Sequence, residues 1–209
     1  KSNKNMAYMF YHLKSLKSLV LDNFNTENVI YMNDLFAGCE SLPFLELDSF
    51  NTSKVIYMNN MFLDCSSLNS LDLSNFDTKS VITMSLLFKG CKSLTSLYLK
   101  NFDTSSTTTF EKMFSECNSL KIIQKLKFNT SSVVTMEYLF YNCHSLKTIE
   151  IEEFNTSKVT RMNHMFYGCS NLIKLNLKNF NVSSVISLDY MFSGCSSLTN
   201  LDITNFNFS

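Results

Sequence analysis

The cysteines are the residues of this sequence whose type and spacing could do chemistry, as metal ligands, nucleophiles or disulfide partners. There are seven, separated by a constant 26 residues: Cys39, Cys65, Cys91, Cys117, Cys143, Cys169 and Cys195. The short Cys–Cys spacing of a zinc site is absent, and His12, His144 and His164 stand at different positions relative to the cysteines. No histidine or carboxylate accompanies every copy, as a repeated nucleophile would require. We therefore predict no metal ligand, no cofactor and no catalytic residue here.

Disulfide bonds are the remaining chemical possibility for the cysteine column. If successive copies stack as neighbouring strands do, their Cα atoms lie about 5 Å apart, which is within the range of a disulfide. However, the side chains of such a stack point in parallel directions, seven is an odd number, and Leu13 occupies the same slot in the first copy. We predict a structural column of buried free thiols that act as small apolar groups.

The whole sequence repeats with the same 26-residue period, in eight copies without insertion or deletion. Two phenylalanine positions, three before and eleven after the cysteine, take 16 of the 19 Phe residues. The unit reads V-x-x-M-x-x-[ML]-F-x-x-C-x-x-L-x-x-L-x-L-x-x-F-[ND]-T. Such short units cannot bury their apolar side alone, but stacked units can, and like residues then form columns.

The spacing changes within each unit. Val, Met, Met or Leu, and Phe fall at 0, 3, 6 and 7, which suits a short helical, 3₁₀ or extended return segment, whereas L-x-L has the period of a strand. We predict a right-handed, leucine-rich-repeat-like solenoid of about eight coils, each with one short parallel strand. Residues 1–209 form a single uncapped array, expected to be a segment of a longer protein. Strand spacing gives a rod of roughly 35–40 Å.

The composition excludes several classes of function. Lys and Arg total 18, as do Asp and Glu, so the net charge of zero argues against nucleic acid and anionic membrane surfaces as partners. Apolar runs stay below the roughly 18–20 residues of a membrane span, so this segment should not insert into a membrane. No G-x-S-x-G, H-E-x-x-H or Gly-rich phosphate loop occurs, and we predict that the chain is not an enzyme.

The repeat resembles a known family. The spacing of Leu68, Leu71 and Leu73 is that of leucine-rich repeats, but Phe76 and Asp77 replace the usual Asn or Cys that follows. Residues 58–81, MNNMFLDCSSLNSLDLSNFDTKSV, are more similar to the BspA-like leucine-rich repeat surface proteins. The resemblance covers the entire chain. It implies an extracellular or cell-surface protein that binds a protein or glycan on another cell or on a matrix. The alternative is a structural spacer that displays another domain and has no ligand.

Residues that vary between copies are the candidates for binding. The middle residue of L-x-L and the residue two before it should point outward from the strand. We call the following set the strand strip: Phe44, Glu46, Ser70, Asp72, Ser96, Tyr98, Ile122, Gln124, Thr148, Glu150, Lys174 and Asn176. Exposed apolar side chains among polar ones are typical of interfaces. The same residues could equally form a solvated face without a ligand, and the oligomeric state stays open.

Other columns have structural interpretations. The repeated Met should lie in the core, and the Thr that follows the second Phe should belong to a turn. N-x-[ST] matches at Asn51, Asn129, Asn155, Asn181 and Asn207 are expected from the repeated turn sequence, although a secreted eukaryotic chain could glycosylate them. Several tyrosines beside the Met column do not share one repeat position. The fifth coil is irregular, and we predict a bulge near residues 121–127.

Overall fold

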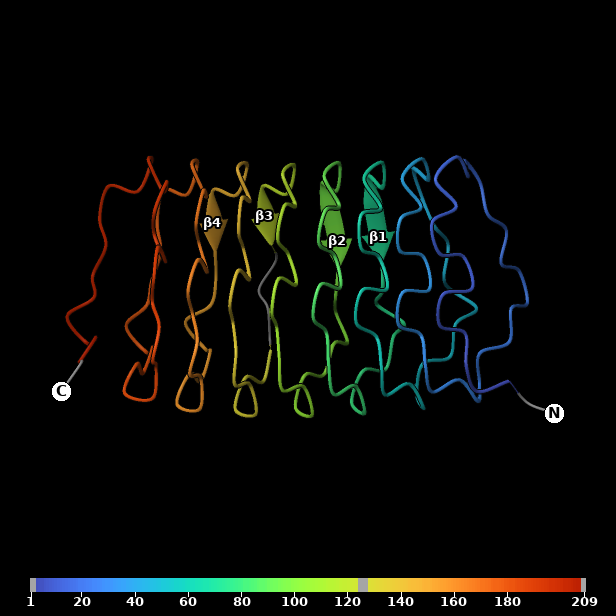
Figure 1. Cartoon of the computed structure of the whole chain (residues 1–209), viewed down its shortest axis with the longest axis horizontal. Helices are drawn as coiled ribbons and strands as arrows, with labels where there is room; N and C mark the ends of the chain where they lie inside the picture. The colour runs from blue at the N-terminus through green and yellow to red at the C-terminus, as the bar shows by residue number, and fades with distance from the viewer. Residues whose placement is uncertain (1–2, 124–127, 208–209) are drawn as a thin grey trace.

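The computed structural model describes residues 3–123 and 128–207 as a row of similar coils stacked along one axis. The chain proceeds coil by coil from one end of the rod to the other (Figure 1). Each coil covers the next, so contacts between residues about 26 apart dominate the fold. The predicted repeat solenoid is confirmed.

Short parallel strands lie where the L-x-L pattern places them (Figure 1). They are β1 (Ser70–Asp72), β2 (Ser96–Tyr98), β3 (Ile122–Ile123) and β4 (Thr148–Ile149). β1 pairs with β2 and β3 with β4, in a register that joins equivalent residues such as Leu71 and Leu97. A bridge from Thr148 to Lys174 continues the row. The register is fixed because every coil has the same length.

A second row of parallel bridges runs along another side of the coil. It joins single residues from coil to coil, including Tyr31 with Tyr57 and Thr135 with Arg161. The third and fourth, fifth and sixth, and sixth and seventh coils are therefore joined by both rows, at two places on their circumference. Two separated ladders prevent one coil from rotating against the next, which gives the stack its constant geometry.

The return segment is a series of tight turns, and the described residues contain no helix. We call this part, residues 58–65 in the third coil, the turn segment. Alternate amides donate to the next coil, as from Phe62 to the Leu87 carbonyl at 3.0 Å. The amides between them donate three residues back, as from Leu63 to Asn60 at 3.0 Å. A helix, α or 3₁₀, would keep all these bonds within one segment, so none of the helical, 3₁₀ and fully extended alternatives describes the whole segment.

Two residues of each turn segment have a positive φ, located five residues and one residue before the cysteine position. The second position holds all four glycines of the chain, Gly38, Gly90, Gly168 and Gly194. Glycine adopts this left-handed conformation without steric penalty. The first position never contains glycine, and in the fourth coil it is Leu86, with a φ of 57°. Leucine is strained there because its Cβ approaches the following carbonyl.

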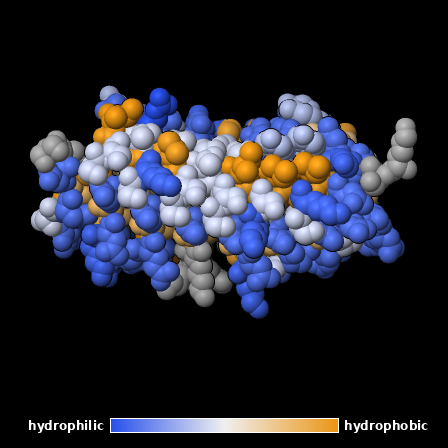
Figure 2. All heavy atoms as spheres, turned by 90° about the horizontal axis from the view of Figure 1, so that it is seen from below, coloured by the Kyte–Doolittle hydropathy of each residue, from blue (hydrophilic) through white to orange (hydrophobic). Residues whose placement is uncertain are grey.

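The core consists of continuous columns of apolar side chains. In the first Phe column, the rings of Phe36 and Phe62 stack with centroids 5.7 Å apart, and Phe88 follows at the same distance. The Met column is buried, as predicted: Met6, Met32, Met58, Met84, Met136 and Met162. Outside, the lower side of the rod mixes hydrophilic residues with short apolar runs (Figure 2). Burial of the columns supplies the main driving force for stacking.

The threonine column forms a buried hydrogen-bond ladder between coils. Its members are Thr26, Thr52, Thr78, Thr104, Thr130 and Thr156. The hydroxyl of Thr78 donates to the carbonyl of Asp103 and accepts from the amide of the same residue, both at 2.8 Å. The Asp103 carboxylate then accepts from the Ser105 amide at 2.9 Å, which closes the turn. The ladder satisfies backbone groups that no strand pairs.

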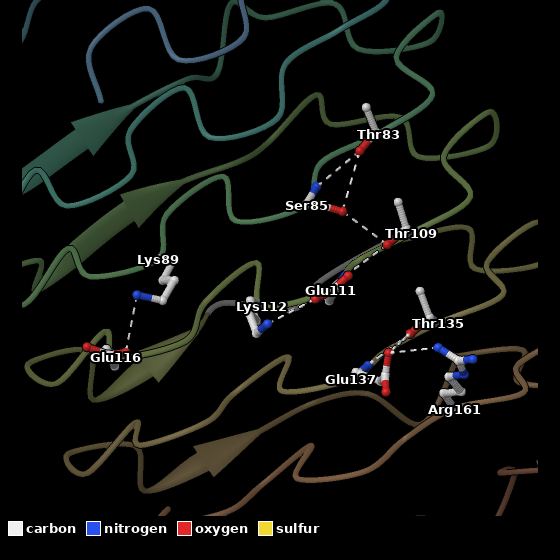
Figure 3. Close-up of polar contacts among 10 residues, drawn as sticks. All are labelled: Thr83, Ser85, Lys89, Thr109, Glu111, Lys112, Glu116, Thr135, Glu137 and Arg161. Carbon is white, nitrogen blue, oxygen red and sulfur yellow. Dashed lines mark hydrogen bonds and ion pairs between the residues drawn. The ribbon is translucent and has the colours of Figure 1, made fainter. Parts of the chain in front are cut away.

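Polar side chains add surface links between coils near the second bridge row (Figure 3). The hydroxyls of Ser85 and Thr109 lie 3.1 Å apart, and Arg161 lies 3.8 Å from Glu137. On the neighbouring side, Lys89 pairs with Glu116 at 3.3 Å (Figure 3). Exposed pairs of this kind contribute at most about 1 kcal/mol each, so they adjust the stack rather than hold it together.

The fifth coil accommodates its sequence irregularities locally. Thr107 stands in the Val slot and is buried, and its hydroxyl donates to the Val81 carbonyl at 3.0 Å. Phe110 stands in the Met slot, and its ring contacts that of Phe128 at 5.3 Å. The bulge predicted near residues 121–127 falls largely on 124–127, which lie outside the described residues. Up to Ile123, the strand keeps the regular register with β4.

Two neighbouring leucines test the left-handed position. Leu86→Asn should raise the free energy of unfolding by a few tenths to about 1 kcal/mol, because Asn tolerates a positive φ. Leu87→Asn should lower it by about 2–5 kcal/mol, because Leu87 is fully buried. Urea denaturation followed by circular dichroism measures both. Equal destabilisation by the two changes would contradict the assigned strain at Leu86.

The threonine ladder predicts a second stability difference. Thr78→Val should lower the free energy of unfolding by about 1–3 kcal/mol, because it leaves the half-buried amide and carbonyl of Asp103 without the Thr78 hydroxyl as partner. Thr78→Ser keeps the hydroxyl and should lose clearly less. The same urea titration compares them, and a valine variant as stable as the serine variant would argue against the ladder.

Candidate functional site

The strand strip lies on the outer face of the rod. Its three apolar members are all exposed: Phe44 at 57%, Tyr98 at 44% and Ile122 at 62%. Most polar members are also exposed, and Ser96 and Asn176 are half-buried. Gln124 lies outside the described residues. The alternation of Ser70, Leu71 and Asp72 as exposed, buried and exposed explains why these side chains point outward.

The ladder register brings specific members of the strip together. Ser70 lies opposite Ser96, Asp72 opposite Tyr98, and Ile122 opposite Thr148. Directly opposed strand residues have Cβ atoms about 5 Å apart, so their side chains form one surface. The strip is therefore a rigid row whose side chains are ordered by backbone hydrogen bonds rather than by loops.

Two members of the strip have local structural roles that the sequence did not reveal. The carboxylate of Asp72 accepts from the Ser74 amide at 2.8 Å, and hydrogen bonds from Ser74 hold the pKa of Asp72 below its ordinary value. Asn176 likewise accepts from the Lys178 amide at 3.2 Å. These side chains close the turns that follow the strand positions. They are less free to contact a ligand than Phe44, whose side chain has no hydrogen-bonding group.

Shallow hollows accompany the strip. One hollow of about 490 Å³ has Glu150, Glu152, Glu153 and Lys174 in its lining. Another, of about 650 Å³, includes Phe44. The first concentrates carboxylates around a single lysine, so its field favours cationic or hydrogen-bond-donating groups. Glu152 and Glu153 were not in the predicted strip because they follow the strand, and only the turn brings them beside it.

The cysteine column lies inside the stack. The structure has seven free thiols, six of them buried and Cys195 half-buried. Each thiol donates to the carbonyl of the Phe 29 residues earlier, with Sγ–O distances of 3.0–3.2 Å. Burial raises the pKa of these thiols, that of Cys143 to about 12 and that of Cys195 to about 11. A protonated, enclosed thiol is a poor nucleophile and a poor metal ligand.

Neither a cluster of metal ligands nor a membrane-spanning helix occurs in the part of the chain that the structure describes. There, no three side chains of His, Cys, Asp or Glu gather in an arrangement suited to a metal ion. In the same residues, no helix has the length and apolar character needed to span a bilayer.

Sequence reasoning missed an aromatic group on the turn segments. Tyr138, His164 and Tyr190 share one repeat position, and Tyr141 and Tyr167 share another. Their rings contact one another along the rod. The 26-residue spacing could have revealed them, but counting tyrosines alone omitted His164 and so concealed the column.

Stacked 26-residue coils with a Leu-lined strand define this molecule as a leucine-rich-repeat solenoid. The family model described as "Mycoplasma protein of unknown function, DUF285" matches residues 4–126 and 121–209. The chain therefore belongs to the DUF285 family. No curated protein matches the chain.

A solved structure supports the same fold. A leucine-rich repeat protein from Eubacterium ventriosum superposes with a TM-score of 0.58 at 18% identity, covering 85% of this chain and 43% of its own. One from Bacteroides ovatus gives 0.46 at 19% identity, covering 94% and 63%. The chain thus spans less than two thirds of these relatives. The resemblance to BspA-like leucine-rich repeat proteins is confirmed. At these sequence identities, the solved structures establish the fold and no more.

The buried thiols predict how stability depends on pH. Their ordinary pKa is 9.0, and burial raises it in the folded state, to about 12 for Cys143. Between these values the unfolded chain releases protons that the folded chain keeps, so the free energy of unfolding should fall as pH rises above about 9. In Cys143→Ala, the slope of the free energy of unfolding against pH should be shallower, by the equivalent of up to one bound proton. Denaturation at pH 8–10.5 measures this, and an identical slope would contradict it.

Proposed function

We propose that this chain is a non-catalytic surface module that binds a protein or glycan partner through the strand strip. The observation that carries the proposal is the exposure of Phe44, Tyr98 and Ile122 on a rigid row of otherwise polar residues. Exposed aromatic and aliphatic side chains on an ordered surface lose little entropy when they bind, which favours recognition.

The distribution of fixed and variable residues supports the same role. Buried Phe, Met, Cys and Thr columns account for the repeated letters, whereas the strip differs from coil to coil. A surface that varies on a constant scaffold allows a specific contact without altering the fold.

We infer a cell-surface or extracellular location from the resemblance to the BspA-like surface proteins. A leucine-rich protein from Faecalibacterium prausnitzii, 15% identical, is itself described as a cell surface protein, and this chain covers 74% of it with a TM-score of 0.37. Neutral net charge is compatible with such a location, because it removes nonspecific attraction to polyanions and leaves recognition to shape and specific contacts.

The test changes three exposed side chains of the strip together. A variant with Phe44→Ser, Tyr98→Ser and Glu150→Gln should fold normally and lose at least tenfold in the binding of labelled protein to intact bacterial and epithelial cells. A matched control changes Val134→Ser, Ile186→Ser and Lys158→Gln, which are also exposed but lie off the strip. The control should bind like the unchanged protein.

The alternative is a spacer without a ligand, favoured by the unbroken Cys ladder that keeps the rod regular from Cys39 to Cys195. If the unchanged protein binds none of these cells while remaining folded, the spacer role replaces the binding role. Equal loss in the strip variant and in the control would also count against the strip.

A further inference from the structure

A second surface lies on the turn segments of the last three coils, where Tyr190 is exposed and the other rings are half-buried. Its members, which we call the aromatic patch, are Tyr138, Tyr141, His164, Tyr167 and Tyr190. The ring of His164 lies between those of Tyr138 and Tyr190, with centroid distances of 4.6 and 5.1 Å. Beside this row, the rings of Tyr141 and Tyr167 stack at 5.1 Å. Two parallel aromatic rows therefore follow the rod axis.

The backbone explains how these rings come to the surface. Tyr138, His164 and Tyr190 occupy the first left-handed position of their coils, with φ values of 55–57°. Earlier coils place Asp34 and Asn60 there, residue types that tolerate this conformation. Large aromatic residues gain nothing in backbone energy at such a position. Their compensation lies in ring stacking, and Tyr190 remains 64% exposed.

The patch is polar, and its Tyr138 end is electrically balanced. Among the hydrogen bonds of the described residues, none involves a hydroxyl of Tyr138, Tyr141, Tyr167 or Tyr190, so these groups face solvent as donors and acceptors. The neighbouring cation Lys112 pairs with Glu111 at 3.0 Å and also lies 4.9 Å from the ring centre of Tyr138. The charges at this edge are thus neutralised within the protein.

His164 adds an unmet hydrogen-bond requirement. Its Nδ1 is buried and has no partner among the described residues. Because this atom is already shielded from solvent, a ligand at the rim of the patch meets the phenolic hydroxyls rather than Nδ1. Ring edges, phenolic hydroxyls and an imidazole together match a ligand that alternates C–H and O–H groups.

We propose that the aromatic patch binds a neutral, linear glycan that lies along the rod axis. The inference rests on the binding role proposed above and names a ligand class for a second face. A polymer whose sugar units advance by about one coil meets equivalent rings at each step. A peptide strand advances by only about 3.3 Å per residue and would lose register along the axis. The balanced charge at the Tyr138 end of the patch favours a neutral ligand over a sulfated or nucleic-acid polymer.

The probes are cellohexaose, xylohexaose and mannohexaose, with heparin as the anionic comparison. The chain has no Trp, so its intrinsic fluorescence comes from nine tyrosines, four of which belong to this patch. We expect at least one neutral hexasaccharide to change tyrosine emission saturably and to be retained in affinity electrophoresis. The affinity should change less than twofold between 50 and 300 mM salt, because few charges are involved.

Variants locate the binding on the protein. Tyr141→Ala combined with Tyr167→Ala should weaken hexasaccharide binding at least tenfold, and the Phe versions of both should weaken it less, since they keep the rings. The strand-strip variant should bind the sugar like the unchanged protein. Circular dichroism and urea denaturation check that each variant folds.

The outcomes separate this inference from the proposed function. No retention of any neutral hexasaccharide, or tighter salt-dependent retention on heparin, overturns the glycan site and leaves the strand strip to be judged by cell binding. Sugar binding that survives in the double Ala variant also overturns the patch. Cell binding lost in the double Ala variant without sugar binding would indicate a protein partner and overturn the glycan class.

Discussion

Hydrogen bonding between successive coils is the constraint on which the rest of this structure depends. In the turn segment, alternate amides reach the next coil, as from Phe62 to Leu87 at 3.0 Å, and the short strands do the same on another side. This pairing works only if every coil has the same length, which accounts for the strict 26-residue period. The constant pitch then allows identical side chains to stack in columns. Phe, Met, Cys and Thr can each be buried against their own copies.

The buried polar groups follow from the same pitch. The Thr78 hydroxyl bonds both the amide and the carbonyl of Asp103, and the Cys91 thiol donates to the Phe62 carbonyl at 3.2 Å. The threonine hydroxyl serves backbone groups that the strands leave without partners, whereas the Phe62 carbonyl also accepts from the Cys65 amide. A small side chain that is both compact and able to hydrogen-bond suits these positions, and Thr and Cys meet that requirement. Their repetition therefore reflects structure and leaves function to other residues.

The two proposed binding surfaces consist of side chains that the stacked coils leave on the outside. The strand strip offers Phe44, Tyr98 and Ile122, and the aromatic patch offers rings ordered by stacking. The two surfaces differ in kind: the strip mixes apolar and acidic groups, whereas the patch is polar, aromatic and balanced in charge at its Tyr138 end. A rod with two distinct faces could engage two partners at once, and its rigidity would fix their relative orientation.

The sequence by itself determined the period, the apolar columns, the place of the strands and the outward direction of the strip, because all of these depend on residue spacing alone. Only the tertiary structure decided the form of the turn segment, since its amides choose partners in the next coil that no local pattern reveals. Only the tertiary structure shows that the side chains of Asp72 and Asn176 accept hydrogen bonds from amides two residues later and so close turns. It also shows that a turn brings Glu152 beside the strip. The aromatic row of Tyr138, His164 and Tyr190 likewise depends on the stacking of coils, which places the ring of His164 between the two tyrosine rings.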